Sequence, residues 1–239
     1  MITSSKLLKE TTSMAVYRHL YNLIVTGYFQ PGEWIRERQI KELLGVSSTP
    51  IREALKMLVQ ERILESVPHH GVRIKNLSFK EIEDIYELRA ELEGLAAQLA
   101  AKRGSLTEFN KMDELLGLTE SKIEKNGNIQ DSELLIFNNE FHDLIIEVSG
   151  NHALKNALFH LRAGIDLIRV MSWKSNSGRS FETLNQHRLI LDAIMARNPN
   201  LARIRTQEHI WDSVKLVLKS AKESNIKVND HGNSLTAST

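Results

Sequence analysis

Four side chains in the second half of the chain have the types and spacing of a metal site. Asn138 and His142 stand four residues apart, so on a helix both project from one face. His187 and His209 each continue an apolar line at helical spacing, which turns both toward a core. Neutral imidazoles are ligands for zinc, nickel, iron or manganese. A divalent metal site is one interpretation; for any single histidine, an ordinary core or surface position is the commoner one.

Arg89 and Glu93 form a second pair at this spacing, next to Tyr86. A partly buried arginine binds a carboxylate through two parallel hydrogen bonds. Arg89 is therefore a candidate residue for binding a small organic acid. The alternative is a helix-surface salt bridge, which stabilises a protein by only a few tenths of a kcal/mol.

A third group of residues, in the stretch LLGVSSTPIREAL (43–55), has the composition of a helix that reads DNA. Ser47, Ser48 and Thr49 offer hydroxyls for a helix cap and for phosphates. Arg52 points away from the apolar face that the intervening aliphatic residues make. Readers of the major groove present arginines and hydroxyls from the first turns of such a helix. The alternative is an ordinary helical hairpin in which Arg52 pairs with Glu53 or Glu42.

The elements that would position this helix predict a winged helix-turn-helix over residues 1–76. Helices are expected over 13–27, 37–44 and 49–62, and short strands over 33–35, 63–67 and 72–74. Arg38 faces outward on the second helix. His70 and Gly71 stand at the tip of the hairpin, where a wing reaches a minor groove. The alternative for the tip is a solvated turn.

Residues 77–222 predict an antiparallel bundle. Six helices are expected, over 79–103, 107–126, 131–148, 151–173, 180–197 and 200–221. Residues 223–239 are polar and are predicted to be a disordered tail. The fold class is therefore mainly α, with a winged helix-turn-helix followed by a six-helix bundle.

Composition excludes several classes of protein. The chain of 239 residues is 41% hydrophobic and 26% charged, which suits a globular protein with a real core. It has no cysteine, which excludes disulfides, thiol catalysis and cysteine zinc sites. No apolar run approaches the roughly 20 residues of a membrane span, and the first residues, MITSSKLLKETTS, have no apolar signal core. We expect a cytoplasmic protein with no membrane partner.

Charge is divided unevenly along the chain. Residues 1–76 hold 11 Lys and Arg against 7 Asp and Glu, a balance of +4. Residues 77–239 hold 20 against 23, a balance of −3. This asymmetry favours nucleic-acid binding by the first part only.

Both halves resemble a known family. GVSSTPIREAL, preceded by PGEWIRERQI and followed by HHGVRI, resembles the GntR family of bacterial transcription regulators. The helical half resembles the FCD ligand-binding domain of the FadR subfamily, in YELRAELEGLAAQLAA, in FNNEFHDLIIEVSGN, and around the histidines of NQHRLILDAI and QEHIW. The resemblance covers about residues 13–221. The count of six bundle helices looks like the VanR-type group.

The resemblance implies roles for particular residues. The DNA-binding residues would be Arg38, Ser47, Ser48, Thr49 and Arg52, with His70 and Gly71 at the wing tip. The metal positions would be Asn138, His142, His187 and His209, and Arg89 would stand where a pocket arginine often lies.

Two positions depart from the family pattern. Arginine is common where this chain has Ser48, so a possible guanine contact is lost and the operator is expected to differ. A bidentate contact of that kind contributes about 1–3 kcal/mol of discrimination. Aspartate is common where this chain has Asn138, so the site loses an anionic ligand and metal affinity should fall.

The sequence therefore predicts a homodimeric, operator-binding transcription regulator, a repressor rather than an enzyme. A small organic acid, with or without a metal ion, would bind in the bundle and change the affinity for double-stranded operator DNA. Two alternatives remain open on the histidines alone: a metal-dependent enzyme, and a sensor of metal with no organic effector.

Overall fold

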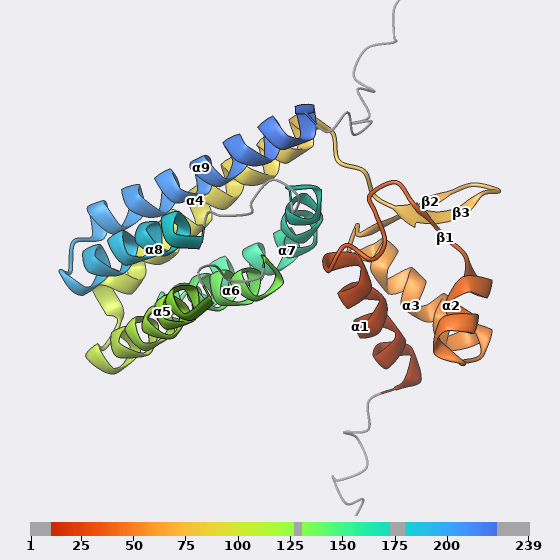
Figure 1. Ribbon diagram of the computed structural model, residues 1–239, viewed down its shortest axis with the longest axis horizontal. Coiled ribbons are helices and arrows are strands. Elements are labelled where there is room, and N and C mark those ends of the chain that lie inside the picture. The colour runs from red at the N-terminus through yellow and green to blue at the C-terminus, as the bar shows by residue number, and fades with distance from the viewer. Residues whose placement is uncertain (1–10, 127–130, 173–179, 224–239) are drawn as a thin grey trace, which may run out of the picture. The chain divides into compact units, whose positions relative to one another are not determined.

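A computed structural model of the chain describes residues 11–126, 131–172 and 180–223. The chain divides into two compact units, Met1–Asn76 and Leu77–Thr239 (Figure 1). The predicted disordered tail lies outside the described residues, except that its first residue, Glu223, is the last residue of a helix.

The described part of the first unit is a winged helix-turn-helix, as predicted. Its elements are α1 (Thr12–Val25), β1 (Trp34–Ile35), α2 (Glu37–Leu44), α3 (Ser48–Gln60), β2 (Leu64–Val67) and β3 (Gly71–Ile74). The three strands form one antiparallel sheet in the order β1-β3-β2. The short first strand therefore pairs with the hairpin and makes a three-stranded wing.

Helices α1 and α3 pack against each other and form the core of this unit. The buried residues on them are Val16, Leu20, Ile24, Ile51, Ala54, Leu55 and Leu58. Gly45 ends α2 with φ at 64°, a left-handed conformation that glycine adopts without steric cost. Ser47 is the N-cap of α3 but makes no side-chain capping bond, so its hydroxyl is not committed to the helix.

The second unit contains six helices among its described residues, as predicted. They are α4 (Phe79–Arg103), α5 (Leu106–Asn126), α6 (Asp131–Val148), α7 (His152–Ser172), α8 (Ser180–Met195) and α9 (Pro199–Glu223). The capping box expected at Ser78 is present, because Ser78 Oγ accepts from the Glu81 N–H and the Glu81 carboxylate accepts from the Ser78 N–H.

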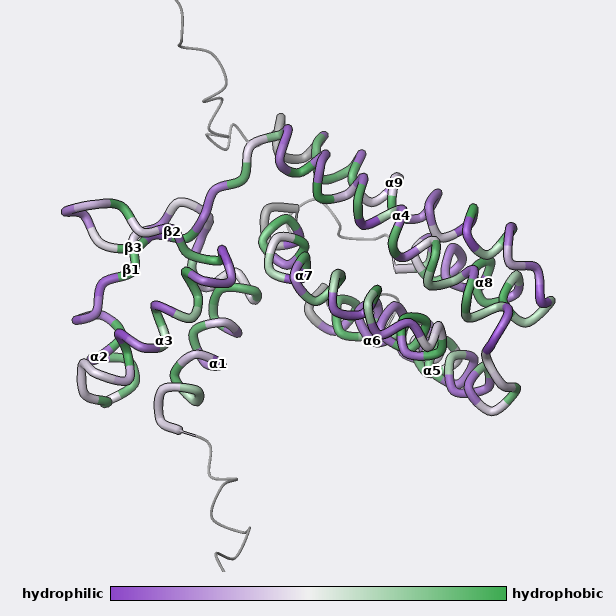
Figure 2. Tube along the Cα trace, turned by 180° about the vertical axis from the view of Figure 1, so that it is seen from behind, coloured by the Kyte–Doolittle hydropathy of each residue, from purple (hydrophilic) through white to green (hydrophobic). Residues whose placement is uncertain are grey.

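Helix α4 lies alongside α9, and α8 packs against both (Figure 1). Hydrophobic and hydrophilic residues alternate along these helices at helical spacing (Figure 2). The apolar faces meet in a core of large aliphatic and aromatic side chains, among them Phe109, Met112, Phe141, Ile190 and Ile194. No helix among the described residues combines the length and the apolar character that a membrane span requires.

Gly104 ends α4 for a reason of packing rather than of backbone conformation. Its φ and ψ, −63° and 151°, are open to any residue. A Cβ at this position would lie 2.5 Å from Cγ1 of Val148 and within contact of the buried Phe109 ring. Side chains from α5 and α6 therefore close over this glycine.

We predict that Gly104→Ala lowers the free energy of unfolding by about 1–3 kcal/mol, because the buried neighbours must move. Gly117, inside α5, is the matched control, since a Cβ there meets only Nη2 of Arg188 at 4.0 Å. Gly117→Ala should instead raise the free energy of unfolding by about 0.5–1 kcal/mol. Urea unfolding measures both, and equal shifts would contradict the packing account.

Candidate functional site

Three buried imidazoles from three helices meet in the second unit. They belong to His142 on α6, His187 on α8 and His209 on α9, and one ring nitrogen of each lies within 4.8 Å of the others. The Nε2 atoms of His142 and His209 are 3.2 Å apart. Nε2 of His187 is buried and has no hydrogen-bond partner among the described residues. The structure thus brings together the three histidines that the sequence indicated.

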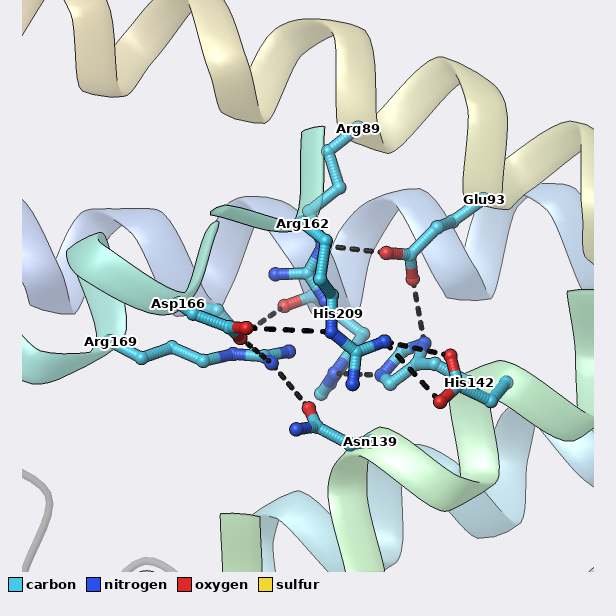
Figure 3. A network of polar contacts seen from close by, with 10 residues as sticks. Arg89, Glu93, Asn139, His142, Arg162, Asp166, Arg169 and His209 are labelled. Atoms are coloured by element: carbon cyan, nitrogen blue, oxygen red, sulfur yellow. Dashed lines mark hydrogen bonds and ion pairs between the residues drawn. The ribbon is translucent and has the colours of Figure 1, made fainter. Parts of the chain in front are cut away.

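A buried carboxylate links this cluster to an arginine. Arg89 Nε donates to Glu93 Oε1 at 2.6 Å, and Glu93 Oε2 lies 2.7 Å from His142 Nδ1 (Figure 3). The side chains of Arg89 and Glu93 are only 3% and 7% exposed. This burial excludes the helix-surface salt bridge that was the alternative for the pair.

Burial and neighbouring charges set the protonation of these groups. Burial alone would raise the pKa of Glu93, but the Arg89 guanidinium and then His142 outweigh it and hold that pKa well below its usual range. Burial, followed by the neighbouring imidazoles, lowers the pKa of His187 and of His209 well below the usual value. Glu93 is therefore ionised and these two imidazoles are neutral, which is the form that binds metals.

The facing nitrogens of His142 and His209 have the separation of two ligands of one divalent cation. Zinc–nitrogen bonds of about 2.0–2.1 Å in a tetrahedral site separate two nitrogens by roughly 3.3 Å, and the Nε2 atoms of His142 and His209 lie 3.2 Å apart. His187 adds a buried ring nitrogen that lacks a hydrogen-bond partner among the described residues. Burying such a nitrogen costs free energy unless a ligand binds it. The three imidazoles are therefore the residues that would hold a metal.

Asn138, predicted as a fourth ligand, lies one turn before His142 on α6 and is half-buried. Its neighbour Asn139 lines the cavity beside the cluster. The metal-binding role of Asn138 stays a prediction.

The cavity has a volume of about 410 Å³ and is lined by α4, α6 and α7, a size suited to a small molecule. Arg89, Arg162 and Arg169 line it together with His142. Arg169 donates to Asn139, and Figure 3 shows these side chains converging from the three helices. Burial lowers the pKa of Arg169 and the like charge of Arg89 lowers it further, against the raising effect of Asp166, which lies 3.4 Å from Arg169 Nη1. A bound anion would relieve this repulsion.

In the first unit, the two predicted DNA-binding arginines lie at the surface. Arg38 is 88% exposed and pairs with Glu42 on its own helix at 3.5 Å. Arg52 is 65% exposed, and its Nε lies 2.9 Å from each carboxylate oxygen of Glu37 on α2. The partner of Arg52 is thus Glu37 rather than Glu42 or Glu53. Ser47 and Thr49 are exposed and Ser48 is half-buried at the start of α3.

The wing places His70 at an exposed turn. The His70 N–H donates to the Val67 carbonyl at 3.0 Å, and His69 adopts a positive φ of 62°, as in a type II turn. Gly71 follows with φ at 101°, a conformation that favours glycine. The Trp34 ring lies 6.0 Å from the His70 ring, centroid to centroid.

Sequence reasoning missed several residues of these sites. One of them is Gln186, which contacts His209 through its Oε1 at 2.8 Å and gave no signal in the sequence. One signal was available: Arg162, Asp166 and Arg169 stand at i, i+4 and i+7 in the stretch 161–171, which is otherwise apolar. A charged stripe at that spacing indicates one polar face, and its two arginines here line the cavity.

Two family models match the chain. The model described as bacterial regulatory proteins, gntR family, matches residues 12–74. The model described as the FCD domain matches residues 84–212. The two matches fall in the two units, in the order of the predicted domains.

Whole-chain relatives agree with these models. The uncharacterized HTH-type transcriptional regulator YdhC of Bacillus subtilis (strain 168) is 32% identical over 211 residues, which are 87% of this chain and 93% of that protein. The probable D-xylose utilization operon transcriptional repressor of Paenarthrobacter nicotinovorans is 29% identical over 209 residues, 87% and 89% of the two chains. The solved structure of E. coli McbR/YncC shares the fold, with a TM-score of 0.75 at 22% identity over 88% of this chain and 99% of that one.

We predict that Arg89→Met lowers the free energy of unfolding by about 3–5 kcal/mol, because it leaves the Glu93 carboxylate buried without its cation. The control is Lys80→Met, which breaks the exposed i, i+4 pair of Lys80 with Asp84 on the same helix and should leave stability unchanged within error. Urea unfolding of the full chain measures both. An Arg89→Met variant as stable as the control would contradict the conclusion that Arg89 compensates the buried charge of Glu93.

Proposed function

Because this chain belongs to the gntR family of bacterial regulatory proteins and carries an FCD domain, we propose that it represses transcription until a small organic acid binds the second unit. DNA-binding transcription regulation is the function of the family, and the FCD domain binds small-molecule effectors. The observation that carries the finer proposal is the convergence of three buried imidazoles beside an arginine-lined cavity.

The first unit reads the operator. The exposure of Arg38 and Arg52 supports this role, since both guanidinium groups are open to a groove or a phosphate. Glu37 holds Arg52 by Nε and so leaves the terminal nitrogens of that guanidinium for a base edge. The hydroxyls of Ser47, Ser48 and Thr49 contact the phosphate backbone of the DNA. His70 and Gly71 approach a minor groove.

The second unit binds the effector. A carboxylate meets Arg89 and Arg169, which line the cavity and repel each other although Glu93 and Asp166 pair with them. His142, His187 and His209 hold a divalent cation next to it, with Asn138 as the remaining ligand of the proposed set. That cation, zinc, nickel, iron or manganese, would supply a Lewis-acidic anchor for the effector carboxylate.

The chain acts as a cytoplasmic homodimer. Two recognition helices on one two-fold axis fit half-sites in successive major grooves. The exposed side chain of Leu88 on α4 supports an apolar contact between the bundle units of two copies. The effector changes operator affinity only by its differential affinity for the two arrangements of the dimer. No turnover of the bound acid is required, so we assign no enzymatic activity.

We predict that Arg52→Ala reduces the preference of the full chain for its operator over random duplex roughly 5- to 150-fold, the loss of one bidentate base contact. The operator is the duplex that the purified chain itself selects from a randomised library. Lys80→Met, which removes one positive charge from the second unit, should leave the preference unchanged. Fluorescence anisotropy titrations measure both ratios at one salt concentration. Undiminished discrimination by Arg52→Ala would remove the assignment of the recognition helix.

We also predict that zinc raises the melting temperature of the chain after chelator treatment, because a ligand of the folded state stabilises it by about 2.7 kcal/mol at 100 times its Kd. His187→Ala should abolish most of this shift. His160→Ala, which removes an exposed imidazole from α7, should keep it. Equal shifts in both variants would show that zinc binds elsewhere. Operator release by zinc alone would favour a metal-only sensor over a sensor of organic acids.

A further inference from the structure

Two ring nitrogens of the histidine cluster face each other across a short distance. Nε2 of His142 and Nε2 of His209 lie 3.2 Å apart in a buried site. If both carried lone pairs, they would repel unless a cation lay between them; if one carried a proton, it would donate to the other. The protonation of these rings is therefore decided by what binds their other nitrogens, Nδ1.

The Nδ1 atom of His209 faces an amide oxygen. Gln186 Oε1 lies 2.8 Å from His209 Nδ1, across the contact between α8 and α9. The orientation of that amide is fixed independently, because Gln186 Nε2 donates to Asp212 Oδ2 at 3.2 Å. An amide oxygen can only accept, so His209 Nδ1 must carry the proton. In a neutral ring this leaves Nε2 as a lone pair.

The Nδ1 atom of His142 faces a carboxylate. Glu93 Oε2 lies 2.7 Å from it, while Glu93 Oε1 accepts from Arg89. An ionised carboxylate so close to a ring nitrogen requires a proton on that nitrogen, since two acceptors would repel. A metal-binding imidazole is neutral, so a His142 ring that binds a metal with Nδ1 protonated presents Nε2 as a lone pair, 3.2 Å from Nε2 of His209.

We propose that Gln186 and Glu93 are positioning residues that hold His209 and His142 as Nδ1–H tautomers, so that both Nε2 lone pairs serve one cation. This inference rests on the proposed metal site. It assigns two chains of outer polar contacts, Asp212–Gln186–His209 and Arg89–Glu93–His142, to the control of metal affinity. Groups that fix ligand tautomers typically change metal affinity 10- to 100-fold when they are removed.

The competing explanation is that the Gln186 contact merely joins two helices. Gln207 provides the matched control, because its amide also joins two helices, donating from α9 to Glu91 on α4 at 2.8 Å. It touches none of the three imidazoles through any contact recorded for the described part of the chain. A purely structural role predicts similar effects for the two glutamines.

The test compares Gln186→Met with Gln207→Met in the full chain. Long-range ¹H–¹⁵N NMR of the metal-free protein reports which ring nitrogen of His209 carries the proton. We expect Nδ1–H in the wild type and in Gln207→Met, and loss of that state in Gln186→Met. Zinc affinity, measured by competition with a chromophoric chelator, should fall about 10- to 100-fold in Gln186→Met alone.

Each outcome discriminates. The inference is overturned if the wild type carries Nε2–H on His209, or if Gln186→Met leaves both the tautomer and the zinc affinity unchanged. In either case, zinc binding by the wild type still supports the metal site. A wild type that binds no zinc refutes the metal site itself. The tautomer of His209 is measured in the metal-free protein, so that part of the inference is tested separately. Gln186→Ala, which removes the acceptor without added bulk, replaces the methionine variant if that variant loses cooperative unfolding.

Discussion

The second unit depends on one buried carboxylate that lies between an arginine and an imidazole. Burying Glu93 is costly unless its charge is compensated, and Arg89 and His142 provide that compensation from one side each. The same contacts fix what the partners can do. Arg89 also lines the cavity. His142 contacts the Glu93 carboxylate through Nδ1 and His209 through Nε2.

Identical spacing has opposite consequences in the two units. Arg89–Glu93 and Arg38–Glu42 are both i, i+4 pairs on helices. The first pair is buried, so breaking it destabilises the protein. The second pair is exposed, contributes little stability and leaves its arginine accessible to an anion. Burial, rather than sequence spacing, therefore distinguishes the two ion pairs. Arg89–Glu93 is a structural part of the effector-binding unit, whereas Arg38 can leave Glu42 and bind a DNA phosphate.

The sequence predicted the fold and the converging histidines because both follow from periodicity. A ring at helical spacing within an apolar line must turn toward a core, and three such helices in one bundle bring His142, His187 and His209 together. The contact of Gln186 with His209 was beyond reach, because it depends on how α8 and α9 are packed. The helix end at Gly104 was predicted correctly, but its packing cause was visible only in three dimensions.

The central claim is that neutral imidazoles, aimed by their outer hydrogen bonds, form a cation site in a transcription regulator. Zinc K-edge X-ray absorption on the zinc-loaded full chain tests it most directly. The account predicts the multiple-scattering signature of about three imidazoles, with zinc–nitrogen distances of about 2.0–2.1 Å. A spectrum fitted by oxygen ligands alone, with no imidazole scattering, would contradict it.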